Sequence, residues 1–254
     1  MTKPILVLKD IVTLVNKGTS SETRILKDLN LTINDGDFIT IVGANGAGKS
    51  TLFNVIGGNL PIDAGKLLLH ETDITNESEE ERTKFLSRVF QDPKLGTAPR
   101  MTVAENLLLA LNRGAKRRLK PRQLKQHMNE FTKLAATMNN GLENRMDTAT
   151  GDLSGGQRQA LSFLMATLKR PDVILLDEHT AALDPRTSQE LLHATNQRIN
   201  EDNLTALMIT HHLEDALKYG NRLVVLDDGQ IKADFKGPDK QKLTMEQLYQ
   251  YFEV

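Results

Sequence analysis

One segment of the sequence has the composition and spacing of a phosphate-binding loop, G-x-x-x-x-G-K-[ST]. It consists of Gly43, Ala44, Asn45, Gly46, Ala47, Gly48, Lys49, Ser50 and Thr51. Its glycines allow backbone N–H groups to turn toward an anion, and a helix that begins where the loop ends adds its dipole. Lys49 can reach β- and γ-phosphates, and the Ser50 hydroxyl can ligate Mg²⁺. The alternative is a glycine-rich turn without a ligand, which the complete pattern disfavours.

Two carboxylates follow an apolar run farther along the chain. Val173 to Leu176 is continuously apolar, as in a strand that is covered on both faces, and Asp177 and Glu178 come next. Open α/β sheets bind ligands at the carboxyl ends of their strands. Asp177 suits a Mg²⁺ shell, and Glu178 suits a base that polarises water. An acidic pair after a strand is often only solvated, but the phosphate loop upstream favours the functional interpretation.

A third segment supplies a second anion-binding end. Leu153-Ser154-Gly155-Gly156-Gln157-Arg158-Gln159 precedes a helical pattern, and it combines a Ser hydroxyl, flexible glycines and a helix N-terminus. It resembles the signature motif of ABC ATPases letter for letter. The other motifs of that family are Val89-Phe90-Gln91-Asp92, Ala182-Leu183-Asp184 and Ile209-Thr210-His211. A lone Gln91 or His211 would be read as structural, but together these motifs make the chain similar to ABC transporter ATP-binding subunits, in particular those of bacterial importers.

The resemblance implies a head-to-tail dimer of two such chains with two ATP molecules between them. In each chain, Glu178, His211 and Gln91 would serve catalysis. Ser50, Gln91 and Asp177 would hold Mg²⁺. The residues that would bind ATP in their own chain are Gly43, Asn45, Gly46, Ala47, Gly48, Lys49, Ser50 and Thr51. The signature residues of the partner, Ser154, Gly155, Gly156 and Gln157, would close on the same ATP. Two anion-binding surfaces on one triphosphate neutralise charge that neither could neutralise alone. Binding therefore drives closure, and hydrolysis removes the bridging group.

The resemblance also implies partners. These are a membrane-spanning permease, which would dock on the segment from Lys94 to Ala104, and an extracytoplasmic substrate-binding protein. The chain would then lie at the cytoplasmic face of the membrane. The docking segment can also be a solvated loop that leads to a helix start at Thr102.

The sequence departs from the family pattern in two places. No aromatic residue precedes Phe38, and Val15 occupies the place where relatives stack an aromatic ring on adenine. Aliphatic contact there weakens the argument for base selectivity, so tolerance of GTP is a hypothesis. His179 replaces the proline that usually follows the catalytic Glu. It is interpreted as a tolerated loop residue, with tuning of Glu178 as the alternative, and His212 receives no role.

The motifs need a parallel sheet to position them. Phe38 to Val42, Val173 to Leu176, Thr205 to Thr210 and Leu223 to Leu226 are apolar runs that predict buried strands. Earlier, Ile5 to Val15 and the alternating Leu29, Leu31 and Ile33 predict further strands, and Asp228-Gly229 predicts a hairpin turn. Helices are predicted from Lys49 to about Ile56, over much of Met101 to Arg170, and from Leu243 to Val254.

The expected fold is α/β. It has a P-loop NTPase core with a mixed sheet, an N-terminal antiparallel β subdomain and a helical subdomain. We expect one ABC ATPase domain over residues 1–254, with 1–90 and 171–254 forming the core and 91–170 the helical subdomain that carries the signature motif.

Composition excludes several classes. The chain has 254 residues, a net charge of -1 and no cysteine, so neither nucleic-acid binding nor a disulfide framework is indicated. No apolar run approaches the roughly 20 residues that span a bilayer, and the N-terminus lacks the apolar core of a signal peptide. The basic stretch from Arg113 to Lys125, with Lys116, Arg117, Arg118 and Arg122, is interpreted as a solvated helix face, with attraction to anionic lipid as the alternative.

Other classes of ABC ATPase remain open. A soluble iron–sulfur assembly ATPase fits the length, but its signature usually continues differently after Gly156. Repair members insert a long coiled coil before the signature, and translation members usually fuse two such domains. A regulator without turnover is disfavoured because Glu178 is present.

Overall fold

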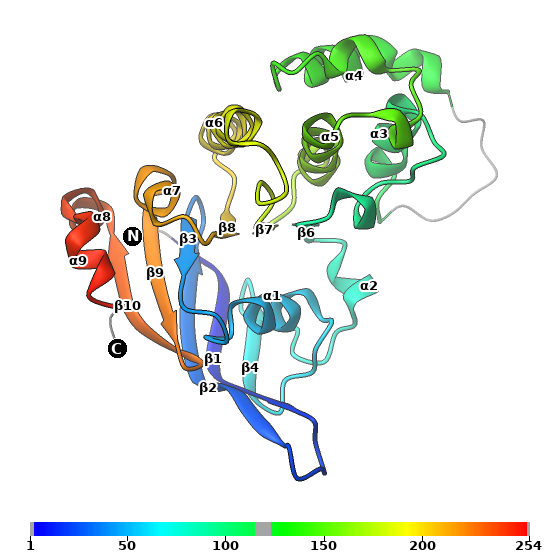
Figure 1. Cartoon of the computed structure of the whole chain (residues 1–254). Helices are drawn as coiled ribbons and strands as arrows, with labels where there is room; N and C mark the ends of the chain where they lie inside the picture. The colour runs from blue at the N-terminus through cyan, green and yellow to red at the C-terminus, as the bar shows by residue number, and fades with distance from the viewer. Residues whose placement is uncertain (1–2, 115–122, 253–254) are drawn as a thin grey trace. The chain divides into compact units, whose positions relative to one another are not determined.

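The computed structural model describes residues 3–114 and 123–252, and these form two compact units (Figure 1). Unit 1 comprises Met1–Arg82 and Asn203–Val254, and unit 2 comprises Thr83–Asp202. The expected α/β class is confirmed. The units differ from the predicted subdomains because strands β6 (Leu86–Val89) and β7 (Val173–Asp177) pair with each other within unit 2.

Unit 1 contains an antiparallel sheet in which the strands have the order β2-β1-β4-β5. The strands are β1 (Pro4–Val15), β2 (Thr23–Asn34), β4 (Ala64–Leu69) and β5 (Thr72–Asp73). Leu29, Leu31 and Ile33 are buried, while Asn30 and Thr32 between them are exposed. The predicted alternation is therefore confirmed, and it fixes which face of β2 packs inward.

A second sheet in unit 1 holds β3 (Phe38–Val42) between two parallel neighbours. These are β8 (Ala206–Ile209) and β9 (Arg222–Asp227), and β10 (Gln230–Lys236) pairs antiparallel with β9. Every residue of β3 and β8 is buried. Asp228 and Gly229 both have positive φ, 44° and 76°, so the predicted hairpin turn is confirmed.

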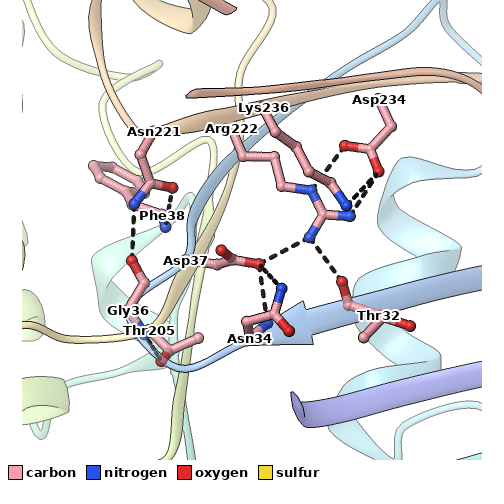
Figure 2. Close-up of polar contacts among 10 residues, drawn as sticks. All are labelled: Thr32, Asn34, Gly36, Asp37, Phe38, Thr205, Asn221, Arg222, Asp234 and Lys236. Atoms are coloured by element: carbon pink, nitrogen blue, oxygen red, sulfur yellow. Dashed lines mark hydrogen bonds and ion pairs between the residues drawn. The ribbon is translucent and has the colours of Figure 1, made fainter. Parts of the chain in front are cut away.

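One buried guanidinium in unit 1, that of Arg222 in β9, contacts β10, β2 and the turn that precedes β3 (Figure 2). The Arg222 side chain is 2% exposed and makes two bonds of 2.7 Å to the Asp234 carboxylate. It also donates to Asp37 at 2.8 Å and to the carbonyl oxygen of Thr32 at 2.7 Å. Because a buried charge needs partners on every side, Arg222 ties β9 and β10 to the end of β2 and to the turn that enters β3.

The helices described in unit 1 are α1 (Lys49–Gly57), α2 (Glu79–Arg82), α7 (Leu213–Lys218), α8 (Gly237–Lys242) and α9 (Met245–Tyr249). The predicted helix from Leu243 to Val254 is wrong in its bounds. Thr244 caps α9 through a capping box, and the helix is only five residues long. Leu248 of α9 packs in an apolar cluster with Val42 and Leu223, so the C-terminal segment covers the strand that leads to the phosphate loop.

Unit 2 is mainly helical around the parallel pair of β6 and β7. Its helices are α3 (Val103–Leu111), α4 (Leu124–Ala136), α5 (Gly155–Thr167) and α6 (Pro185–Glu201), with short 3₁₀ segments η1 (Pro93–Leu95), η2 (Leu142–Arg145) and η3 (Thr150–Asp152). The mostly helical character predicted for Met101 to Arg170 is confirmed in the described parts of that range, 101–114 and 123–170. Within the described ranges, no helix combines the length and apolar character that crossing a membrane requires.

Four residues of the basic stretch, Lys116, Arg117, Arg118 and Arg122, lie outside the described residues. Arg113 at its start is not a solvated side chain. Its guanidinium donates to the Ser87 hydroxyl and, at 2.6 Å, to the carbonyl oxygen of Lys169. These bonds join the end of α3 to β6 and to the segment after α5.

Candidate nucleotide-binding site

The phosphate loop of unit 1 connects β3 to α1, as its sequence predicts. Gly46 and Gly48 have φ of 84° and 101°, which L side chains rarely adopt. The Lys49 ammonium donates to the carbonyl oxygens of Gly43 and Ala44 at 2.7 and 2.9 Å. Positive charge therefore lies within the loop itself, while Asn45 and Gly46 at its tip are exposed.

The β9–β10 hairpin supports this loop from behind. The Gly229 amide donates to the Ala47 carbonyl oxygen at 3.0 Å. Gly43 passes so close to β9 that an added Cβ would overlap the Leu226 carbonyl oxygen. The first glycine of the motif is thus required by backbone packing as well as by phosphate access.

His211 belongs to the same edge of the same sheet. β3 and β8 are parallel neighbours, with Ile41 opposite Ile209. The phosphate loop and the His211 loop therefore leave the sheet from the same end. Both His211 and His212 are exposed, and His212 precedes α7.

The second half of the predicted site is in unit 2. β6 and β7 are parallel neighbours with Val89 opposite Leu176, so Gln91 and the pair Asp177-Glu178 also leave one common edge. Gln91 is exposed. Glu178 has a φ of 46°, a left-handed conformation that is uncommon for a residue other than glycine. Strained conformations of this kind gather at functional sites.

The signature segment begins α5. The Ser154 hydroxyl accepts from the Gln157 backbone N–H at 3.2 Å, and the Gln157 side-chain oxygen accepts from the Ser154 backbone N–H at 3.4 Å. Gly156 is buried so closely against Thr187 of α6 that a Cβ would overlap the Thr187 methyl group. Ser154 and Gly155 are exposed, so the helix N-terminus is open to an anion.

His179 behaves differently from the two exposed histidines. Its side chain is 2% exposed, and burial lowers its pKa to about 4, so the ring is neutral at pH 7. Its Nε2 atom has no hydrogen-bond partner among the described residues. The predicted alternative, that His179 tunes Glu178, stays a prediction.

Two contacts near these motifs were not predicted from the sequence. Arg88 of β6 forms an ion pair of 2.5 Å with Asp177. The Gln159 amide of α5 donates to the Phe90 carbonyl oxygen at 2.9 Å, directly before Gln91. The only sequence signal for Arg88 was a charged residue inside an otherwise strand-like run.

The donor atoms suit Mg²⁺. Ser50, Asp177 and Gln91 offer hydroxyl, carboxylate and amide oxygens, which are hard ligands of the kind that Mg²⁺ prefers. Across residues 3–114 and 123–252, no group of three or more His, Asp or Glu side chains could hold a metal ion by itself. Ser50 lies in unit 1, and Gln91 and Asp177 lie in unit 2. Each is a ligand of the kind that Mg²⁺ takes together with water and substrate phosphates.

Comparison with known proteins agrees with this geometry. The pattern of the ABC transporter family matches residues 26–181. The tyrosine transport ATP-binding protein of Clostridioides difficile strain R20291 is 47% identical over 90% of this chain and 91% of its own length. The thiamine import ATP-binding protein ThiQ of Escherichia coli strain UTI89 is 36% identical over 80% of this chain and 82% of its own length.

Solved structures give the same result. An ATP-binding cassette of an ABC transporter superposes over 100% of both chains with a TM-score of 0.80 and 27% identity. A dimeric cassette in a post-hydrolysis state, bound to ADP and Pi, superposes over 91% of this chain and 98% of its own with a TM-score of 0.75 and 26% identity.

Proposed function

The chain belongs to the ABC transporter family of ATP-binding proteins, and from this membership we propose that it hydrolyses ATP with Mg²⁺ to drive uptake through a permease. The observation that carries the proposal is the arrangement of loops on parallel strands. The phosphate loop and His211 share one strand edge in unit 1, and Gln91, Asp177 and Glu178 share another in unit 2.

The two edges hold one ATP in this proposal. Lys49 binds the β- and γ-phosphates, the backbone amides of Asn45 to Thr51 surround them, and Ser50, Asp177 and Gln91 hold Mg²⁺. The metal, when bound, neutralises charge on the phosphate oxygens. Glu178 accepts a hydrogen bond from the attacking water and His211 contacts the γ-phosphate, so that charge that develops in the transition state meets fixed donors.

A second copy of the chain completes the site. The N-terminus of α5 closes on the ATP of the partner chain through the exposed Ser154 and Gly155 and through Gly156 and Gln157 behind them. The dimeric cassette among the structural neighbours supports a dimer of this kind. Closure is then driven by binding, because the γ-phosphate bridges the two halves.

We place the permease contact on the predicted segment from Lys94 to Ala104. Leu95 in this segment is 71% exposed, so its apolar side chain is available for contact with a partner. The chain would accordingly lie at the cytoplasmic face of the membrane, with an extracytoplasmic binding protein in the same system. Normal assembly with the permease after Leu95→Asp would refute this placement.

The relatives are transport proteins, so a soluble assembly ATPase is not favoured. The C. difficile relative with 47% identity is named for tyrosine transport, and we propose an amino acid such as tyrosine as the first substrate to test with the cognate permease. The ATPase subunit does not select that substrate itself.

The preference of the site for adenine over guanine is a separate question. The half-buried Val15 ends β1 at the place where an aromatic ring is expected. Hydrolysis assays that show no activity with GTP would refute tolerance of that nucleotide.

Replacement of Glu178 by Gln tests the proposal. Loss of the base should lower ATP hydrolysis by about 10²- to 10⁴-fold, and saturating ATP should then trap a stable dimer, measurable by size-exclusion chromatography with light scattering. Glu246→Gln on the exposed face of α9 is the matched control and should hydrolyse ATP normally. A Glu178→Gln protein that stays monomeric in saturating ATP would contradict the sandwich mechanism.

A further inference from the structure

Arg88 is a charged residue directed at the proposed metal ligand from a neighbouring strand. Its guanidinium lies 2.5 Å from Oδ2 of Asp177, and the two side chains are only 13% and 16% exposed. The register of the sheet explains the contact. Arg88 lies opposite Leu175 in the pair of β6 and β7, and Asp177, two residues farther on, projects from the same face of the sheet.

The same guanidinium also contacts the segment that carries Gln91. Arg88 lies over the Phe90 ring with 5.0 Å between its Cζ atom and the ring centroid, a cation–π contact. The carbonyl oxygen of Phe90 accepts the bond from Gln159, a residue that is 1% exposed. Arg88 therefore contacts both Asp177 and the Phe90 ring, and α5 contacts the backbone of Phe90.

We propose that Arg88 is a positioning residue that orients the Asp177 carboxylate for Mg²⁺. This inference rests on the proposed function, because it requires the Mg²⁺·ATP site. A carboxylate held through one oxygen presents its other oxygen in a fixed direction. Groups that hydrogen-bond to metal ligands typically contribute 10- to 100-fold to metal affinity.

Two effects of Arg88 on the metal have opposite signs. Orientation of the carboxylate strengthens Mg²⁺ binding, whereas the nearby positive charge weakens it. The Asp177 carboxylate is largely withdrawn from water, so without Arg88 it would lack its counter-ion and turn toward other donors or solvent. The gain from an oriented carboxylate therefore exceeds the repulsion between Arg88 and Mg²⁺. Arg88 thus lowers the Mg²⁺ concentration at which the site is half occupied.

The experiment titrates Mg²⁺ into protein saturated with the non-hydrolysable analogue adenylyl imidodiphosphate and follows the thermal unfolding midpoint. In Arg88→Gln, half-maximal stabilisation should require about ten times more Mg²⁺ than in wild type. Arg88→Lys keeps the charge but lacks the two-pronged guanidinium, so it should fall between them. Binding of the analogue in EDTA should be the same in all three proteins.

Arg198→Gln is the matched control, because it removes another Arg–Asp pair of unit 2, formed with Asp202 at 2.7 Å. It should keep the wild-type Mg²⁺ requirement. An unchanged or lower Mg²⁺ requirement in Arg88→Gln overturns the inference, and if that variant does not fold, a wild-type requirement in Arg88→Lys overturns it. A wild-type protein that Mg²⁺ does not stabilise at all would instead refute the proposed function.

Discussion

The Gln159 side chain donates a hydrogen bond of 2.9 Å to the carbonyl oxygen of Phe90. This bond joins α5, which begins at the signature residue Ser154, to the end of the strand that leads to Gln91. The helix that carries the signature residues and the loop that carries Gln91 are thus joined by a hydrogen bond within unit 2.

Replacement of Gln159 by Leu should destabilise the protein. The partly buried carbonyl oxygen of Phe90 would lose its donor, and the loss of such a hydrogen bond costs about 1 kcal/mol. Urea unfolding followed by circular dichroism measures the loss. Gln126→Leu on the exposed surface of α4 controls for the change in residue type. Equal free energies of unfolding for Gln159→Leu and wild type would show that the bond does not support the fold.

The phosphate loop offers a comparison between two glycines. Gly43→Ala should lose about 3 kcal/mol of stability because its Cβ would overlap backbone of β9. Gly46→Ala has open space around its Cβ but a φ of 84°, so only backbone strain of about 1 to 2 kcal/mol is expected. Denaturant unfolding of both variants gives the ranking, and a more damaging Gly46→Ala would contradict the packing role of Gly43.

Ser154→Ala should separate capping from ATP contact. Thr244 caps α9 with the same capping box as Ser154, so alanine at either position should cost about 1 kcal/mol of stability. Each substitution is then combined with Glu178→Gln, and the ATP concentration at which half of the protein is dimeric is measured. Only Ser154→Ala should raise that concentration. Equal weakening by Thr244→Ala would mean that lost stability, and not a phosphate contact, explains the effect.

The strands at the site could be predicted because each is an apolar run with clear ends. Phe38 to Val42 was predicted with the bounds that β3 has, and the run that began at Val173 is β7. Asp228-Gly229 could be predicted because a two-residue hairpin turn requires positive φ at both positions. In such segments local chemistry and the fold agree.

The contacts between segments could not be predicted in this way. Arg88 and Asp177 are 89 residues apart, and only the register of β6 against β7 brings them together. The last helices were also misjudged, although signals for them exist: Thr244 followed by Gln247 is a capping box, and Gly237-Pro238 favours a helix start. The burial of Lys240 in α8 could not be predicted from the sequence, because lysine side chains are usually exposed.

Lys240 should make stability depend on pH above neutrality. Its ammonium donates to the carbonyl oxygens of Tyr219 and Gly220, and burial lowers its pKa from 10.5 to about 8. Between these two values the unfolded chain binds the proton and the folded chain does not, so stability from this group rises with pH. Relative to Lys240→Met, wild type should therefore gain about 1 to 3 kcal/mol of unfolding free energy as pH increases from below 8 to 10.5. Urea unfolding across this range measures the gain, and Lys242→Met at an exposed position of the same helix should show none. A constant difference between wild type and Lys240→Met would mean that the buried amine keeps its proton.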